Sequence, residues 1–191
     1  MRTETTDDTA ARIERVLDKP DDELAAELPG LLDDIEGRTE QLLLDNPALF
    51  ARVTQRMDAV DIAGFATEWP ETVEQFQGML WTGMELLVQA SSDVQASIAE
   101  DISVNFAATD APMTGHLRVV ESEETVHGGT DLLDDPDLTI TGPADELVAL
   151  ITGNADPIQG FMQQDYDIDG DIQKGTRLAA TMNELTKLLP G

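Results

Sequence analysis

The sequence predicts an α+β fold with an all-helical N-terminal extension. Apolar residues in the first 90 positions recur at helical spacing, and no segment there alternates as a strand would. Beyond Ser91, short segments of alternating apolar and polar residues appear between turn residues, which is typical of half-buried strands. Helical segments are interleaved with these strands, and one closes the chain. We therefore predict a helical subdomain at 1–90 and a second domain of strands and helices at 91–191.

The N-terminal helices are predicted from apolar stripes. A short first stripe has the spacing i, i+3, i+4 and consists of Ile13, Val16 and Leu17. A longer helix is expected after Pro29, with an apolar face formed by Leu31, Leu32, Ile35, Leu42 and Leu43. Asn46-Pro47 is a cap followed by a proline at the first helical position of the next segment. The last stripe follows Pro70 and steps through Val73, Phe76, Leu80, Met84 and Leu87.

Strands and helices of the second domain are predicted from changes in periodicity. The expected strands lie at 102–106, 117–120, 125–128, 138–141 and 166–169. Short helices are expected around 94–99, from Pro143 to Gly153, and after Asp156-Pro157. Asp145 and Glu146 fall in the first turn of the second of these, where they complement the helix dipole. An amphipathic helix at 172–189 closes the chain.

The net charge of −28 comes from 39 acidic and 11 basic residues, with lysine only at Lys19, Lys174 and Lys187. The acidic residues alternate with aliphatic residues along the whole chain, which argues against an acidic disordered protein. Self-repulsion at this charge destabilises a compact state in dilute buffer. At molar salt the Debye length falls to roughly 3 Å and the repulsion is screened. The surface resembles that of a cytoplasmic protein from an extreme halophile of the haloarchaeal kind.

Composition also excludes several classes of function. The chain offers no cluster of Lys or Arg for phosphate contacts, so we expect no nucleic-acid partner. It has no cysteine, which excludes disulfides and thiolate metal sites. The N-terminal MRTETTDDTA has no apolar signal core, and no apolar run approaches the ~18 residues of a membrane span. We therefore expect a cytoplasmic location and no stable membrane insertion.

From about Asp101 to Leu189, the order of elements and several residues resemble the SCP2-like (sterol carrier protein 2) family. The most recognisable stretch is Asp137–Ile172, DLTITGPADELVALITGNADPIQGFMQQDYDIDGDI. The resemblance rests on the strand at 137–140, the helix, glycine stop and proline restart through Pro157, the Phe161-Met162-Gln163 segment, and the Tyr166-x-Ile168-x-Gly170 strand. It implies a five-stranded, mainly antiparallel sheet covered by helices. Gln164 departs from the small residue usual there, and Asp165, Asp167 and Asp169 replace typical lysines, as halophilic substitution would predict.

The resemblance also implies a function and a site. In this family an apolar tunnel lies between the sheet and the later helices, and a gap between such layers suits a ligand that is mostly hydrocarbon. The residues expected to line it are Phe106, Phe161, Met162, Gln163, Ile172, Leu178, Met182 and Leu185. Gln163 would need a polar partner inside, either a ligand head group or a backbone carbonyl. We expect non-catalytic binding of an acyl, isoprenoid or quinone-type lipid, without a cofactor.

A calcium site is a competing hypothesis. Asp165-Tyr166-Asp167-Ile168-Asp169-Gly170-Asp171-Ile172 matches the first eight positions of an EF-hand loop, with Asp165, Asp167, Asp169 and Asp171 as candidate oxygen donors. Position 12 is Thr176, where a bidentate glutamate is required, and no full helix precedes the loop. Alternation with Tyr166 and Ile168 inward equally fits a strand with an acidic outer face. We therefore expect no metal site.

The sequence also bears on two further classes of function, enzymes and protein-interaction modules. His116 and His127 lack neighbouring ligands at metal spacing, and the sequence contains no catalytic motif, so no enzyme is expected. An interaction or accessory module is the main alternative, with the stripe through Val73, Phe76, Leu80 and Met84 docking onto a second copy or a partner protein. An exposed stripe would favour that alternative, whereas a buried one would favour the lipid carrier.

Overall fold

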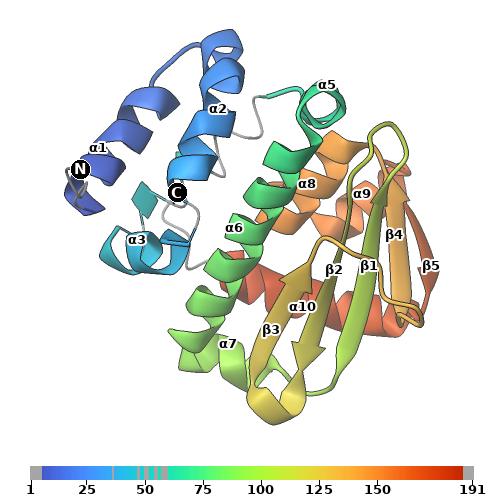
Figure 1. The fold of residues 1–191 in the computed structure, drawn as a ribbon. Coiled ribbons are helices and arrows are strands. Elements are labelled where there is room, and N and C mark those ends of the chain that lie inside the picture. The colour runs from blue at the N-terminus through green and yellow to red at the C-terminus, as the bar shows by residue number, and fades with distance from the viewer. Residues whose placement is uncertain are drawn as a thin grey trace.

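The computed structural model describes residues 6–35, 37–46, 48–49, 52–53, 56 and 60–186. It confirms the predicted α+β class, because N-terminal helices precede a five-stranded sheet that is itself covered by helices (Figure 1). One continuous core of buried apolar side chains runs from Ile13 to Leu185. The helical part and the sheet therefore share a hydrophobic interior.

The sheet has the strand order β3-β2-β1-β4-β5 and is mostly antiparallel. Its strands are β1 (Ile102–Ala108), β2 (Thr114–Val120), β3 (Thr125–Gly129), β4 (Leu138–Gly142) and β5 (Asp167–Gly170). Only β1 and β4 pair in parallel, with Val104 opposite Leu138 and Phe106 opposite Ile140. All five predicted strands are present within a few residues of their expected ends. Each turns its alternate, mainly aliphatic, residues toward the helices.

The first helices are α1 (Thr6–Leu17), α2 (Asp21–Ile35), α3 (Thr39–Asp45) and α5 (Ile62–Glu68). The expectation that a long helix begins after Pro29 is wrong, because α2 runs through this proline. Burial of Leu28, Leu31 and Leu32 offsets the ~3 kcal/mol that an internal proline costs. The chain instead breaks at Gly37, whose φ of 72° is left-handed. The predicted start at Asn46-Pro47 lies partly outside the described residues.

Helix α6 (Pro70–Gln89) joins the two parts of the molecule. It packs against β3 on one side and against α2, α3 and α5 on the other, and it leads into α7 (Ser92–Ser97). Its predicted apolar stripe is buried at Val73, Phe76, Leu80 and Met84. The proposed boundary near residue 90 therefore follows a helix that contacts both parts, and it stays a prediction.

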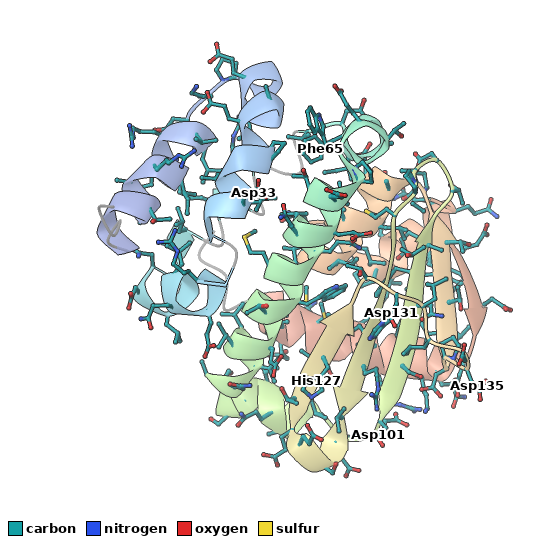
Figure 2. All side chains as sticks on the ribbon, in the orientation of Figure 1. Asp33, Phe65, Asp101, His127, Asp131 and Asp135 are labelled. Carbon is teal, nitrogen blue, oxygen red and sulfur yellow. The ribbon has the colours of Figure 1, made fainter. Side chains whose placement is uncertain are left out.

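The remaining helices, α8 (Ala144–Thr152), α9 (Pro157–Gln163) and α10 (Ile172–Thr186), cover the sheet, and α10 crosses behind it in Figure 1. The opposite face is polar and carries the connection between β3 and β4, on which Figure 2 labels Asp131 and Asp135. Asn105 holds this connection through two hydrogen bonds of 2.9 Å with the backbone of Leu133. The apolar interior thus lies on the helix side of the sheet.

Candidate functional site

A cavity of about 590 Å³ lies between the sheet and helices α8, α9 and α10, and its far end reaches α6. Inward side chains of β1, β2, β4 and β5 form one wall, and helical side chains form the other. The lining comprises Trp81, Phe106, Leu117, Leu138, Ile140, Leu150, Ile151, Gly153, Ala155, Asp156, Pro157, Ile158, Phe161, Tyr166, Ile168, Ile172, Gly175, Thr176, Leu178, Ala179, Met182 and Asn183. The lining is predominantly aliphatic and aromatic, and it suits a hydrocarbon ligand.

Exposure along this lining distinguishes an inner end from a rim. Phe106 and Leu117 are buried at the inner end. Gly153 at the end of α8 is an exposed lining residue, but most exposed lining residues lie at α9 and α10 and form the rim; these are Asp156, Ile158, Phe161, Ile172, Thr176 and Asn183. Ile158 and Ile172 are 59% and 53% exposed, unusually high values for large aliphatic side chains. The cavity therefore runs across the sheet and opens between α9 and α10.

Five of the eight residues predicted to line the tunnel lie on this cavity: Phe106, Phe161, Ile172, Leu178 and Met182. Three do not. Met162 is 78% exposed and Gln163 is also exposed, because both lie on the outer side of the short helix α9. Gln163 therefore needs no partner inside the protein. Leu185 is buried in the shared core, two positions beyond Asn183, the last lining residue on α10.

Trp81 forms the inner end of the cavity and is not among the residues predicted from the sequence. Its ring stacks on Phe106, with ring centroids 6.2 Å apart. It lies so close to β3 that a Cβ atom on Gly128 would come within 2.3 Å of its Cδ2. Its buried indole N–H has no hydrogen-bond partner among the described residues. The only sequence signal was a bulky aromatic residue on the same helix as the apolar stripe.

Tyr166 fastens α9 over the cavity. Its hydroxyl donates to the carbonyl of Pro157 in the first turn of α9, and its ring packs directly on Gly160. Burial, aided by the charges of nearby carboxylates, raises the pKa of Tyr166 and outweighs the opposing effect of a hydrogen bond with the backbone of Phe161. Asp156 accepts hydrogen bonds from the backbone N–H groups of Ile158 and Gln159 at 2.9 and 2.8 Å and so caps the same helix.

Asp137 fastens the start of α10 to the sheet. It accepts hydrogen bonds from Lys174 Nζ at 2.8 Å and from the backbone N–H and hydroxyl of Ser103 at 2.8 and 3.0 Å. Burial opposes ionisation of this carboxyl, but the three donors together outweigh burial and hold its pKa below the ordinary value. The same contact, against a smaller effect of burial, raises the pKa of Lys174. The wall of the cavity formed by α10 is thus held by a charged, hydrogen-bonded contact.

The four aspartates of the calcium hypothesis are not arranged as a metal site. Asp167 and Asp169 lie on the exposed face of β5, opposite Thr141 and Thr139 of β4. Asp171 caps α10 by accepting from the backbone N–H groups of Gln173 and Lys174. Within the part of the chain that the structure describes, no three His, Cys, Asp or Glu side chains could together hold a metal ion. The sequence forms a strand and a helix cap where an EF-hand would need a loop.

Few side chains of the lining can ionise. Among the described lining residues only Asp156 and Tyr166 can titrate, and both already hold α9 in place. His116 and His127 lie on strands β2 and β3 with exposed carboxylate neighbours, away from this lining. The fold and the cavity together define a small α+β domain with an internal apolar compartment.

Comparison with known proteins finds a similarity to one family over part of the chain. Residues 99–183 match the family model described as the SCP-2 sterol transfer family, so the predicted resemblance is confirmed over that stretch. The family is one of lipid-binding sterol carriers, which are generally non-catalytic. No curated protein matches the chain significantly.

Several solved structures are similar to this chain. The UbiJ-SCP2 ubiquinone synthesis protein has 15% identity and a TM-score of 0.45, covering 61% of this chain and 94% of its own. The sterol carrier protein domain 2 of Helicoverpa armigera has 17% identity and a TM-score of 0.44, covering 61% and 90%. The sec-alkylsulfatase Pisa1 from Pseudomonas sp. has 14% identity and a TM-score of 0.42, covering 100% of this chain and 33% of that enzyme.

Among the described residues, no helix has both the length and the apolar character that crossing a membrane requires.

Proposed function

We propose that this protein binds and carries a hydrophobic ligand, an acyl, isoprenoid or quinone-type lipid, in the cavity beneath its sheet. The observation that carries the proposal is the apolar lining of a cavity of about 590 Å³ that opens between α9 and α10. A volume of this size falls in the range of small-molecule sites, roughly 300–1,000 Å³. The family match over residues 99–183 supports the same class of ligand.

The binding energy would come from removing hydrocarbon from water. Each buried CH₂ contributes about 0.8 kcal/mol, so a chain lying along Phe106, Ile140 and Leu178 needs no strong polar contact. Met182 adds a flexible, polarizable side chain that adapts to ligands of different shape. The exposed apolar residues of the rim, Ile158 and Phe161, would be the first to meet an entering chain.

This function needs no catalysis and no cofactor. In the described lining, the carboxylate of Asp156 and the hydroxyl of Tyr166 are used to hold α9. A docking role for the helical part has less support, because Val73, Phe76, Leu80 and Met84 are buried rather than exposed. The strongly acidic composition supports a halophilic source for the protein.

The test is mass spectrometry of the organic extract of protein purified in molar salt. Two methionine variants form a matched pair: Met182→Gln introduces an amide into the lining, whereas Met162→Gln makes the same change on the exposed outer side of α9. We expect a specific lipid to co-purify with the wild type and with Met162→Gln and to be lost from Met182→Gln. Binding of the neutral dye Nile red, measured by fluorescence, should follow the same order.

An empty extract together with no Nile red binding by the wild type would reject the carrier function. It would favour an interaction module that has kept the fold without a cargo. Equal loss of lipid from both methionine variants would also count against the cavity as the binding place.

A further inference from the structure

Resting on the proposed lipid-binding function, we propose that the cavity selects ligands whose exposed end carries no negative charge, and that Asp156 at its rim sets this selectivity. The ligand class is an uncharged oxygen-bearing lipid, such as an alcohol, ester or ketone, rather than a fatty-acid anion. The inference follows from which groups meet the polar end of a ligand at the rim.

The rim offers a carboxylate where a fatty acid would need a cation. Asp156 is exposed and is also part of the lining, so the rim includes a carboxylate residue. In the described lining no side chain carries a positive charge. A second negative charge placed there would be repelled, since two like charges about 4 Å apart interact strongly even when partly shielded by solvent.

Among the residues that the structure describes, the cations nearest in sequence to the rim are already engaged. Lys174 on α10 contacts Asp137 at 2.8 Å and the carbonyl of Asp101 at 3.0 Å. Arg177 forms an ion pair with Glu100. Both residues are therefore directed to the end of the sheet where β1 begins, and releasing either toward a ligand would leave its acidic partner without a cation.

The neutral donors of the rim are engaged as well. The hydroxyl of Thr176 donates to the carbonyl of Ile172 at 3.0 Å, and that of Tyr166 donates to the carbonyl of Pro157. Asn183 also has a partner. The backbone N–H groups at the start of α9 are taken by Asp156 itself. An incoming carboxylate would thus lose its hydration without gaining charged or neutral donors, which is costly for an ion.

The experiment compares two ligands that share a hydrocarbon chain, dodecanoate and methyl dodecanoate. The affinity of each ligand is measured by its displacement of Nile red at neutral pH, where the carboxyl group of dodecanoate is ionised. An ester enters any apolar site more readily than a carboxylate. A wild-type preference for the ester over dodecanoate is therefore uninformative by itself. The measured quantity is the change in the ratio of the two affinities between wild type and Asp156→Asn.

Asp156→Asn suits this purpose because asparagine caps helices about as well as aspartate does. We expect the preference for the ester to fall about tenfold in low salt, the size of one close like-charge repulsion at partial screening, and less in molar KCl. Asp156→Ser, a second uncharged cap, should give the same result. Asp61→Asn is the control, since Asp61 caps α5 in the same way, outside the cavity lining.

An unchanged ratio in both Asp156 variants, whether or not their absolute affinities fall, would overturn the proposed selectivity. So would a wild-type protein that binds dodecanoate more tightly than its ester. If neither ligand displaces Nile red, or the dye itself does not bind, the lipid-binding function fails, which is a different result from a lipid-binding protein without the selectivity.

Discussion

Asp137 connects three elements that are distant in sequence. Its carboxylate binds Ser103 at the start of β1 and Lys174 in the first turn of α10, and its own carbonyl accepts from the backbone N–H of Asp171 at 2.9 Å. Hydrogen bonds to a charged group contribute about 1.5–3 kcal/mol each when the group is shielded from water. This residue should therefore matter more to stability than most of the other aspartates.

Replacing Asp137 by asparagine should lower the free energy of unfolding at neutral pH by about 1–3 kcal/mol. Because the folded-state pKa of Asp137 is lowered, its contribution is present above the unfolded-state pKa of about 4 and is lost as pH falls through the folded value. The difference between wild type and variant should accordingly narrow in the acid range. Urea unfolding at fixed ionic strength across a pH series measures it.

Lys174→Met serves as a second variant, because it removes the partner and leaves the carboxyl. The raised pKa of Lys174 means that its contribution persists through neutral pH and is lost only as pH rises through its folded value, above its ordinary pKa. If the free energy of unfolding of Asp137→Asn stays below that of wild type by the same amount down to the lowest pH, the side chain stabilises the protein through its shape and not through its charge.

Helix α6 shows what an element-level pattern can and cannot predict. The spacing of Val73, Phe76 and Leu80 predicted the helix and its buried stripe. The same spacing could not place Trp81 over β3, since that position depends on Gly128, 47 positions further along and without a side chain. A glycine contributes no side chain to the contact, so it adds nothing to the apolar periodicity of the sequence.

The short helix α9 shows the same limit at the site. Phe161 and Met162 were both predicted to line the tunnel, yet neighbouring positions on a helix point about 100° apart, and only Phe161 does so. Seven residues are too few to define an apolar stripe. The strands and the helices α6 and α10 were predictable from periodicity, whereas the orientation of α9 depends on Tyr166 and Gly160 packing together.

The contact between α6 and β3 can be tested by a double-mutant cycle with Gly128→Ala and Trp81→Leu. In the wild type the added methyl would lie 2.3 Å from Cδ2 of Trp81, so α6 or β3 must shift; overpacking of this kind costs about 1–3 kcal/mol. In the Trp81→Leu background the same methyl should cost much less. Thermal and urea unfolding give the four stabilities, and additive effects of the two changes would argue against the direct contact.

Taken together, the molecule places its charge outside a continuous apolar core. Leu24, Val104 and Leu147, from the helical part, the sheet and α8, are all fully buried in this core. The edge strand β5 carries Asp167 and Asp169 on its exposed face, opposite uncharged threonines. Charged side chains on an edge strand also hinder edge-to-edge association. The many acidic groups of the surface repel one another, however, and this repulsion destabilises the folded protein.

That repulsion predicts how stability depends on salt. The Tm should rise as KCl increases from about 0.1 M to 1 M, because the Debye length falls from about 10 Å to 3 Å. Asp167→Asn/Asp169→Asn should have a higher Tm than wild type in low salt and a shallower rise, since the change removes two carboxylates that form no ion pair with another described residue. Glu27→Gln is the control, because Glu27 is paired with Lys19 and its removal should not relieve repulsion. Parallel curves for wild type and the double variant would instead assign the salt effect to strengthened burial of apolar surface. In that case the acidic surface would serve solubility, and the inference of a halophilic source would lose its physical basis.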